Sequence, residues 1–336
     1  MKTHISNIVT IIVPCYNEYN YITQFLKNIE GQTLPFTTEL IIIDGGSTDG
    51  TTDILKHYNT SKFKFRLIEH NKKFVPISLN LGIHSSKGDI IIRLDVHTIY
   101  DKNYIYNSVK LLIKYNYQCV GGPWRSRHSS FLQKAISFAF QSKICSGGAL
   151  SRDINYCGLV DSVYLGCWKK DYLVNIGLFD ERLIRNQDDE LCLRIRNNGG
   201  RVYQHKSIKS FYYPRSNYSC LFNQYFQYGF WRHKTQCYTN RLSMFRHLLP
   251  VFITLFLLLS IILVFNKLYI LLYIYILFYL CPILITLLYE CKSLLLLPFS
   301  LAAVFIMHHS YGLGYISSFI THIFKFKFMF AERVTR

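Results

Sequence analysis

The feature that most constrains this chain is a change in composition near residue 248. Residues 1 to about 240 have the mixed composition of a globular domain, whereas apolar and aromatic residues predominate afterwards. Leu248 to Phe265 is a run of 18 residues without a charge, and Leu268 to Tyr289 is a run of 22. Each run can cross a hydrocarbon core about 30 Å thick. Because only Asn266 and Lys267 separate them, the two runs predict a helical hairpin in a membrane.

Further membrane segments are expected after this hairpin. Leu294 to about His308 is a third candidate span, and residues 310–324, with Gly312 and Gly314, are expected to form a fourth short span or an interfacial helix. His308 and His309 are expected to have hydrogen-bond partners or to reach a helix end rather than to mark a functional site. We therefore predict a globular domain at 1–240 and a membrane region at 241–336 with two to four transmembrane or interfacial helices.

The net charge of +18 is attributed to a membrane surface. No basic run with interleaved stacking aromatics argues for nucleic acid, so a nucleic-acid partner is not expected. Basic residues instead flank the apolar runs: Lys234, Arg241 and Arg246 before the first run, and Lys325, Lys327, Arg333 and Arg336 in the tail. The ten cysteines contain no C-x-x-C pair and are expected to be reduced thiols. Ile8 to Val13 is too short for a signal peptide.

Short apolar runs alternate with helical patterns in the first 240 residues. The expected strands are Val9 to Val13, Glu39 to Ile43, Phe65 to Glu69, Asp89 to Leu94 and Cys119 to Gly122, and the expected helices include one with Ile22, Phe25, Leu26 and Ile29, one opening at Thr51, Ile77 to His84 and Asn103 to Tyr115. Such alternation with short links predicts an α/β fold, Rossmann-like, with a mostly parallel sheet and helices on both faces. Residues 123–155 show a weaker pattern and are interpreted as an acceptor-side segment.

The strand that ends at Leu94 carries the first candidate site. Ligands collect at the carboxyl ends of strands in open α/β sheets, which is where Asp95 and His97 stand. Their alternate spacing allows a carboxylate and an imidazole to reach one divalent cation, the natural partner of a nucleotide diphosphate. Taken alone, the stretch is equally consistent with a strand end followed by a polar turn.

Two other strand ends carry candidate ligand loops. After the first strand, Pro14 is expected to stop the ladder and Asn17 to cap the following helix. After the second, Asp44-Gly-Gly-Ser-Thr-Asp-Gly-Thr51 opens a helix, and its glycines and the helix N-terminus suit a phosphate. This loop lacks both the P-loop and the dinucleotide pattern. A plain turn between strand and helix remains the alternative.

A cluster of acids begins a later helix. Asp188, Asp189 and Glu190 precede Leu191 and Ile195 at helical spacing. A carboxylate facing a sugar pocket can take a proton from an attacking hydroxyl. Acids at a helix N-terminus can equally be partners of the helix dipole.

Taken together, these motifs resemble family 2 glycosyltransferases, which have the GT-A fold. The resemblance rests on Val-Pro-Cys-Tyr-Asn-Glu at 13–18, the loop at 44–51, Asp95-Val-His97 and Asp188-Asp-Glu-Leu191, in this order, and covers roughly residues 8–235. A finer pattern resembles the membrane-associated branch that builds succinoglycan-type exopolysaccharides: Arg93-Leu-Asp-Val-His97, Val120-Gly-Gly-Pro123 and Tyr213-Pro-Arg215.

The resemblance implies a role for each matching residue. Nucleotide-binding residues would be Pro14, Asn17, Glu18, Asp44, Gly46, Ser47, Asp49, Arg93 and Asp95; metal ligands for Mn²⁺ or Mg²⁺ would be Asp95 and His97; the catalytic base would be Asp188; and acceptor-side residues would be Gln187, Asp189, Gln227 and Trp231.

Three residues depart from the family pattern. Gln187 stands where Glu is usual, which removes a charge beside the expected base. His97 replaces the second Asp of the D-x-D motif, and imidazole is a competent ligand for manganese-like ions. Phe230 stands where the Q-x-x-R-W motif has Arg, which weakens the case for processive polymer synthesis. As an alternative to acceptor contact, Tyr225, Phe226, Phe230 and Trp231 are interpreted as one face of a helix lying on the membrane.

The resemblance implies a metal-dependent, inverting glycosyltransferase of cell-surface polysaccharide synthesis. Its donor would be a nucleotide-diphosphate sugar, with UDP favoured by family frequency, and its acceptor a lipid-linked saccharide. The protein would be a multi-pass protein of the cell inner membrane in contact with membrane lipid, with its catalytic domain facing the cytoplasm and an even number of crossings. The alternatives are a polyprenyl-phosphate sugar synthase and a catalytically silent membrane scaffold with a degenerate site.

Overall fold

The computed structural model describes residues 8–144, 146–240, 245–291 and 293–325, and the chain divides into two compact units. One contains Met1–Arg125 and Leu150–Tyr212, and the other contains Ser126–Ala149 and Tyr213–Arg336. This division follows the packing of the chain. The boundary expected at residue 240, between a catalytic domain and a membrane region, stays a prediction. Four of the basic residues expected beside the membrane, Arg241, Lys327, Arg333 and Arg336, lie outside the described residues.

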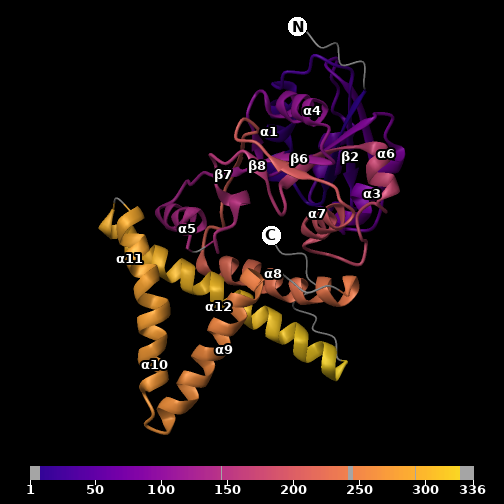
Figure 1. The fold of residues 1–336 in the computed structure, drawn as a ribbon. Coiled ribbons are helices and arrows are strands. Elements are labelled where there is room, and N and C mark those ends of the chain that lie inside the picture. Colours follow the sequence, from indigo (N-terminus) through magenta and orange to yellow (C-terminus); the bar gives the residue numbers. More distant parts are fainter. Residues whose placement is uncertain (1–7, 145, 241–244, 292, 326–336) are drawn as a thin grey trace. The chain divides into compact units, whose positions relative to one another are not determined.

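An eight-stranded sheet forms the centre of the first unit (Figure 1), in the order β3-β2-β1-β4-β9-β6-β10-β8. The strands are β1 (Val9–Cys15), β2 (Thr38–Asp44), β3 (Lys64–Glu69), β4 (Ile90–Arg93), β6 (Cys119–Gly122), β8 (Gly158–Leu159), β9 (Tyr164–Lys169) and β10 (Val202–Gln204). Strands β3, β2, β1 and β4 are parallel, which confirms the α/β prediction. Strand β9 lies antiparallel between β4 and β6. A second sheet joins β5 (Ile99–Tyr100), β11 (Ser210–Tyr212) and β7 (Trp124–Ser126).

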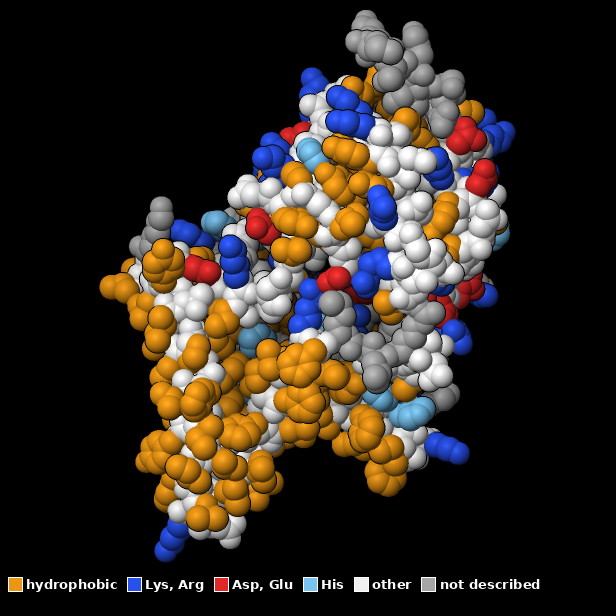
Figure 2. All heavy atoms as spheres, in the orientation of Figure 1, with side chains coloured by type: hydrophobic (Ala, Val, Ile, Leu, Met, Phe, Trp, Pro, Cys, Tyr) orange, Lys and Arg blue, Asp and Glu red, His pale blue; other side chains and the backbone are white. Residues whose placement is uncertain are grey.

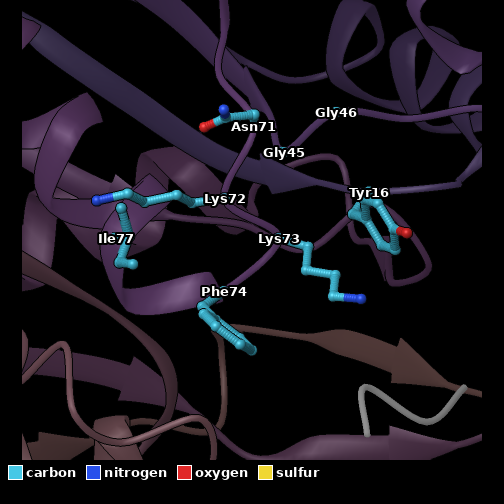
Figure 3. Close-up of a pocket in the computed structure, with 8 residues that line it drawn as sticks. All are labelled: Tyr16, Gly45, Gly46, Asn71, Lys72, Lys73, Phe74 and Ile77. Atoms are coloured by element: carbon cyan, nitrogen blue, oxygen red, sulfur yellow. The ribbon is translucent and has the colours of Figure 1, made fainter.

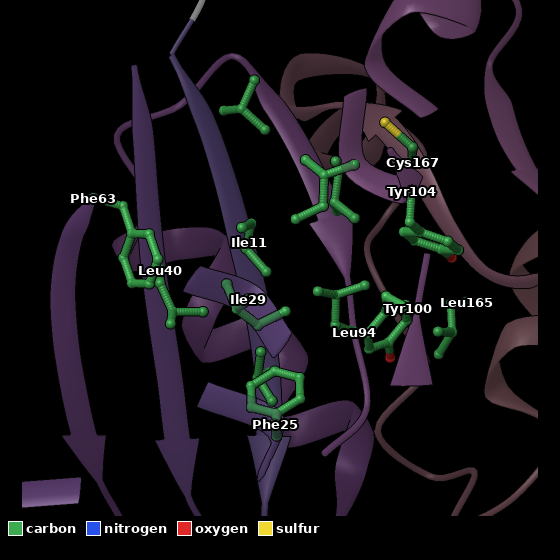
Figure 4. Close-up of a cluster of buried hydrophobic side chains, with 14 of the residues drawn as sticks. Ile11, Phe25, Ile29, Leu40, Phe63, Leu94, Tyr100, Tyr104, Leu165 and Cys167 are labelled. Atoms are coloured by element: carbon green, nitrogen blue, oxygen red, sulfur yellow. The ribbon is translucent and has the colours of Figure 1, made fainter. Parts of the chain in front are cut away.

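Helices cover both faces of the large sheet. They are α1 (Tyr19–Glu30), α2 (Thr51–Lys56), α3 (Val75–Ser85), α4 (Tyr104–Tyr115), α6 (Lys170–Asn175) and α7 (Gln187–Asn197). Ile11 belongs to the buried cluster that holds Phe25 and Ile29 of α1 (Figure 4), whereas its neighbour Ile12 belongs to the cluster that holds Leu79 of α3. Because adjacent residues of β1 enter different cores, the strand has no solvent-facing side, which explains why Thr10, whose hydroxyl bonds to Glu39, is its one polar side chain between Val9 and Val13.

Two local predictions about the first strand and helix are wrong. Strand β1 continues through Pro14, which pairs with Ile43, and ends at Cys15. Asn17 does not cap α1, because the N-cap position is Glu18, which makes no side-chain cap hydrogen bond. Asn17 has a left-handed backbone with φ 54°, and its side chain accepts a hydrogen bond from the loop after β2 instead. Asparagine tolerates this conformation better than most residues.

The second unit is helical. It comprises α5 (Phe131–Gln141), α8 (Tyr218–Thr239), α9 (Phe245–Phe265), α10 (Ile270–Tyr275), a π-helix (Ile276–Leu280), α11 (Cys281–Glu290) and α12 (Leu297–Phe324). Three helical stretches, Phe245–Phe265, Ile270–Glu290 and Leu294–Phe324, are long and apolar enough to cross a membrane. Hydrophobic side chains cover the surface of α9, α10 and α11 in Figure 2. These helices support membrane association, and the first two form the predicted hairpin.

The fourth, separate segment expected at residues 310–324 is a misprediction, because α12 runs unbroken to Phe324. Its two glycines are sites of close helix contact rather than a break. A Cβ on Gly312 would lie 2.1 Å from Thr254 Oγ1 of α9, and one on Gly314 would lie 2.0 Å from the Phe226 carbonyl oxygen of α8. Small residues allow such close approach of helix backbones.

The same packing corrects the interpretation of α8 as a helix lying on the membrane. Phe226, Phe230 and Trp231 are 7%, 2% and 4% exposed, so their rings lie inside the helical unit.

In contrast, the expectation for the two histidines of α12 is confirmed. His309 lies 2.7 Å from the Tyr275 hydroxyl, and His308 lies 3.0 Å from the Tyr279 hydroxyl.

We expect Gly314→Ala to destabilise the helical unit, since the added methyl group must push α12 away from a backbone carbonyl of α8. Overpacking of this kind costs about 1–3 kcal/mol. Thermal unfolding of the detergent-solubilised protein should show a lower midpoint than for the wild type. The control is Ala302→Val, at a half-buried position of the same helix. An unchanged midpoint for Gly314→Ala would contradict this account of the helix contact.

Candidate active site

The loops after β1 and β2 are joined by hydrogen bonds. Backbone N–H groups of residues 17, 18 and 19 donate to Ser47, Thr51 and Asp49, respectively, at 2.8–3.0 Å. A further hydrogen bond joins the loops, in which Thr48 N donates to the side-chain oxygen of Asn17 at 2.9 Å. Two motifs that are about thirty residues apart in the sequence therefore form one structure at the carboxyl ends of adjacent strands.

Asp44 shapes the second of these loops. It is 1% exposed, and its two carboxylate oxygens accept from the hydroxyls of Ser47 and Thr52, each at 2.5 Å. Gly46 follows with φ 86°, a left-handed conformation that glycine adopts without steric cost. Both oxygens of Asp44 are thus engaged within the loop, and its contact with a nucleotide stays a prediction.

An open pocket of about 560 Å³ lies beside this loop, a size typical of small-molecule sites. Figure 3 shows its lining, which comes from the segments that follow β1, β2 and β3: Tyr16, Gly45, Gly46, Asn71, Lys72, Lys73, Phe74 and Ile77. Of these residues, Gly46 alone was predicted to bind the nucleotide, although Tyr16 and Gly45 lie within the motifs at 13–18 and 44–51. The missing signal was the position of residues 71–74 directly after β3, which neighbours β2.

Arg93 and Asp95 form an ion pair where β4 ends. The Arg93 Nε lies 3.2 Å from Asp95 Oδ1, and Nη2 lies 3.4 Å from Oδ2. The Tyr100 hydroxyl fixes the Asp95 backbone, because it accepts from the N–H at 2.8 Å and donates to the carbonyl oxygen at 3.0 Å. Burial alone would lower the pKa of Arg93, but the carboxylates of Asp95 and Asp188 raise it, and the net direction is upward.

Asp188 therefore lies close enough to Arg93 for their charges to interact, which brings together the candidate base and the residues after β4. It stands in the first turn of α7, between the buried Gln187 and the half-buried Asp189. Desolvation and the charge of Asp189 raise the pKa of Asp188, and Arg93 opposes this only in part. A carboxylate with a raised pKa is a better proton acceptor, which suits a general base.

His97 lies next to a second acid, Glu18. Its Nδ1 is 3.5 Å from Glu18 Oε1, and the Glu18 side chain is 1% exposed. The His97 ring also contacts Tyr212 with ring centroids 6.4 Å apart. Among the described residues, no group of three or more His, Cys, Asp or Glu side chains is arranged to hold a metal ion. Asp95 and His97 still have the donor chemistry that Mn²⁺ accepts, provided that a bound diphosphate and water complete the ligand set.

The remaining acceptor-side candidates lie on α8. Gln227 and Trp231 are 1% and 4% exposed. Both belong to the helical unit, and their role at an acceptor stays a prediction.

Comparison with known proteins identifies the domain that contains these loops. Residues 10–151 match the model described as glycosyl transferase family 2. The chain carries a family 2 glycosyltransferase domain. This match covers β1 to β7, and with them the loops after β1, β2, β3 and β4.

Curated relatives extend the likeness beyond this domain. Succinoglycan biosynthesis protein ExoA of Rhizobium meliloti (strain 1021) is 27% identical over 243 residues, which cover 72% of this chain and 74% of that protein. Dolichyl N-acetyl-alpha-D-glucosaminyl phosphate 3-beta-D-2,3-diacetamido-2,3-dideoxy-beta-D-glucuronosyltransferase of Methanococcus voltae is 28% identical over 233 residues, 66% of this chain and 72% of that protein. These relatives support glycosyltransferase activity in exopolysaccharide or glycan biosynthesis.

A solved structure shows the same fold over nearly the whole chain. The mannosyltransferase PcManGT from Pyrobaculum calidifontis, in complex with GDP-Man and Mn²⁺, has a TM-score of 0.62 and 15% sequence identity, and the match covers 94% of this chain and 88% of that one. The predicted GT-A architecture is thus confirmed.

The raised pKa of Asp188 predicts a stability effect with a definite sign. Because the pKa in the folded state is above the ordinary value of 3.8, the ionised carboxylate costs folding free energy at neutral pH and costs none once the pH is below that value. Asp188→Asn should therefore raise the thermal midpoint near neutral pH, and the gain should vanish in acid. The exposed Asp89→Asn is the control. A lower midpoint for Asp188→Asn at neutral pH would refute this sign.

Proposed function

We propose that the protein is an inverting glycosyltransferase that moves a sugar from a nucleotide-diphosphate sugar to a lipid-linked saccharide at a membrane. The observation that carries the proposal is the ion pair of Asp95 with the buried Arg93, whose charge also interacts with that of Asp188. Nη1 of Arg93 is buried without a hydrogen-bond acceptor in the described part of the chain. A buried donor in this state is costly, and an oxygen of a bound donor sugar would satisfy it.

The residues that line the pocket suit the nucleotide part of the donor. Its glycines let a ligand approach the backbone closely, and Tyr16 and Phe74 offer aromatic surface for a base (Figure 3). Lys72 and Lys73 provide cations that suit a diphosphate. The pocket does not distinguish UDP from GDP, and UDP is the first donor to test.

Asp188 supplies the base that the transfer needs. It removes a proton from the acceptor hydroxyl, and the resulting oxygen attacks the anomeric carbon from the side opposite the phosphate. The new carbon–oxygen bond forms as the bond to the diphosphate breaks, so the configuration inverts. Arg93 restrains Asp95 and interacts with Asp188, which keeps both carboxylates at fixed positions around the reacting sugar.

A divalent cation, Mn²⁺ or Mg²⁺, would be held by Asp95 and His97 and would supply positive charge toward the departing diphosphate. The ion pair between Arg93 and Asp95 would hold the Asp95 carboxylate in place before a cation binds.

A lipid-linked acceptor agrees with the helices that are able to cross a membrane. It also agrees with the printed name of the Methanococcus voltae relative, which includes a dolichyl-linked sugar phosphate. We place the catalytic domain on the cytoplasmic side of the inner membrane, where nucleotide sugars are made.

Release of nucleoside diphosphate by membranes that contain the protein tests this proposal. UDP-, GDP- and dTDP-sugars are offered with lipid extract, polyprenyl phosphate or a polyprenyl diphosphate saccharide, with and without Mn²⁺. Asp188→Asn should lower turnover on the order of 10² to 10⁴-fold, and Asp95→Asn and His97→Ala should abolish the response to Mn²⁺. Near-normal turnover by Asp188→Asn would refute the base. Transfer to polyprenyl phosphate would indicate a polyprenyl-phosphate sugar synthase, and nucleotide binding without transfer to any acceptor would indicate a silent scaffold.

Binding of the free nucleotide tests the pocket separately. Lys73→Ala should weaken binding of UDP about tenfold, since one charge-assisted contact is lost, and higher salt should reduce the difference. Calorimetry with the purified protein measures both effects. Lys64→Ala is the control because Lys64 begins β3, at the opposite end of the strand from the pocket. Equal affinities of the two variants for UDP would show that Lys73 does not contact the nucleotide.

A further inference from the structure

Asp188 is carried on α7, and the segment before this helix is held from two sides. This segment, residues 176–181, contains two residues with left-handed backbone, Gly177 at φ 93° and Leu178 at φ 57°. The left-handed conformation is unfavourable for leucine. A turn with this strain persists only when surrounding contacts enforce it.

Asn80 of α3 makes the first set of contacts. Its Nδ2 donates to the Phe179 carbonyl oxygen at 2.9 Å and to Glu181 Oε1 at 3.0 Å, and its Oδ1 accepts from Phe179 N at 3.0 Å. Asn80 is 7% exposed. The amide thus pairs with both backbone groups of Phe179, as a neighbouring strand would.

Arg194 of α7 makes the second set. Its Nη1 donates to the Ile176 carbonyl oxygen at 2.6 Å, and its Nη2 donates to the Leu178 carbonyl oxygen at 2.7 Å. The same guanidinium forms an ion pair with Glu190 at 2.6 Å, which orients it. A lysine has one ammonium and no planar fork, so it does not reproduce this geometry.

The two sets of contacts connect the candidate base to the nucleotide pocket. Phe74, at the N-cap of α3, and Ile77, in its first turn, line that pocket, and Asn80 lies one turn further along the same helix. From the segment held by Asn80, the chain continues through the buried Leu183 into α7 and Asp188. Helix α3 therefore contributes to the wall of the pocket and, through Asn80, holds the segment that leads to the base.

We propose that Asn80 and Arg194 are positioning residues that hold Asp188 in register with the bound donor. This inference rests on the proposed function, since it takes Asp188 as the base. Neither residue touches the reacting atoms in this proposal. Each acts on turnover through the placement of α7, and small displacements of a catalytic group are expensive: about 1 Å costs on the order of 10²-fold.

The test compares Asn80→Ala, Arg194→Lys and Asp188→Asn in the full-length protein. With the donor identified in the release assay and lipid extract as acceptor, the two positioning variants should lower turnover about tenfold to a hundredfold. Binding of UDP by calorimetry should stay within about threefold of the wild type. The acid limb of the pH profile of turnover should shift, because the surroundings of Asp188 change. Leu79→Val, a buried apolar position on α3, controls for destabilisation and should keep normal turnover.

The outcomes separate this inference from the proposed function. If Asp188→Asn is inactive while both positioning variants match Leu79→Val in turnover and pH profile, the positioning role is overturned and the base assignment stands. If Asp188→Asn is as active as the wild type, the proposed function itself fails. Where Asn80→Ala does not fold, Arg194→Lys decides, since it keeps the charge beside Glu190. Loss of folding in both variants would assign the two residues to stability and would overturn the inference.

Discussion

A buried guanidinium lies at the centre of the candidate site. Arg93 is 6% exposed, and a cation in such surroundings is stable only when carboxylates offset its loss of hydration. Asp95 supplies this charge in an ion pair at the end of β4, and Asp188 at the start of α7 makes a smaller contribution. Arg93 in turn stabilises the ionised form of Asp188, which the neighbouring charge of Asp189 disfavours. Residues of two elements far apart in the sequence thus interact through one buried charge.

Much of the fold was predictable because burial on both faces leaves a clear pattern in strands. Strands β1, β2, β4 and β6 appear as short, mainly apolar runs, whereas β3 at the sheet edge mixes charged and apolar residues. The helices between them follow a separate periodicity. Strand β9 was not predicted, because Gly166, with φ 138°, interrupts its pattern. The sequence also could not reveal that Asn17 bonds to the next loop, since such a contact depends on the distance between strands rather than on neighbours in the chain.

The part of the candidate site that was predictable consists of residues whose type alone indicates their chemistry. Asp95 and Asp188 were identified as acids at the ends of elements; in the structure Asp95 pairs with Arg93, and the charge of Asp188 interacts with that of Arg93. The pocket residues 71–74 were missed, since lysine, phenylalanine and asparagine in a loop have no distinctive spacing. Asn80 and Arg194 were missed for a related reason. Their effect depends on backbone carbonyl groups, which every residue type carries.

The path of the chain through its two units has a practical consequence. Residues 126–149 belong to the helical unit although they interrupt the sequence of the other unit. Within that unit, Ser300 of α12 donates to the Ala135 carbonyl oxygen of α5 at 3.2 Å, and α8 packs closely on α12 at Gly314. A fragment that ends at residue 240 would keep α5 and α8 but remove the helix that covers them, and so would expose apolar surface to water. A fragment that contains only the sheet unit therefore requires an internal deletion as well as a terminal one.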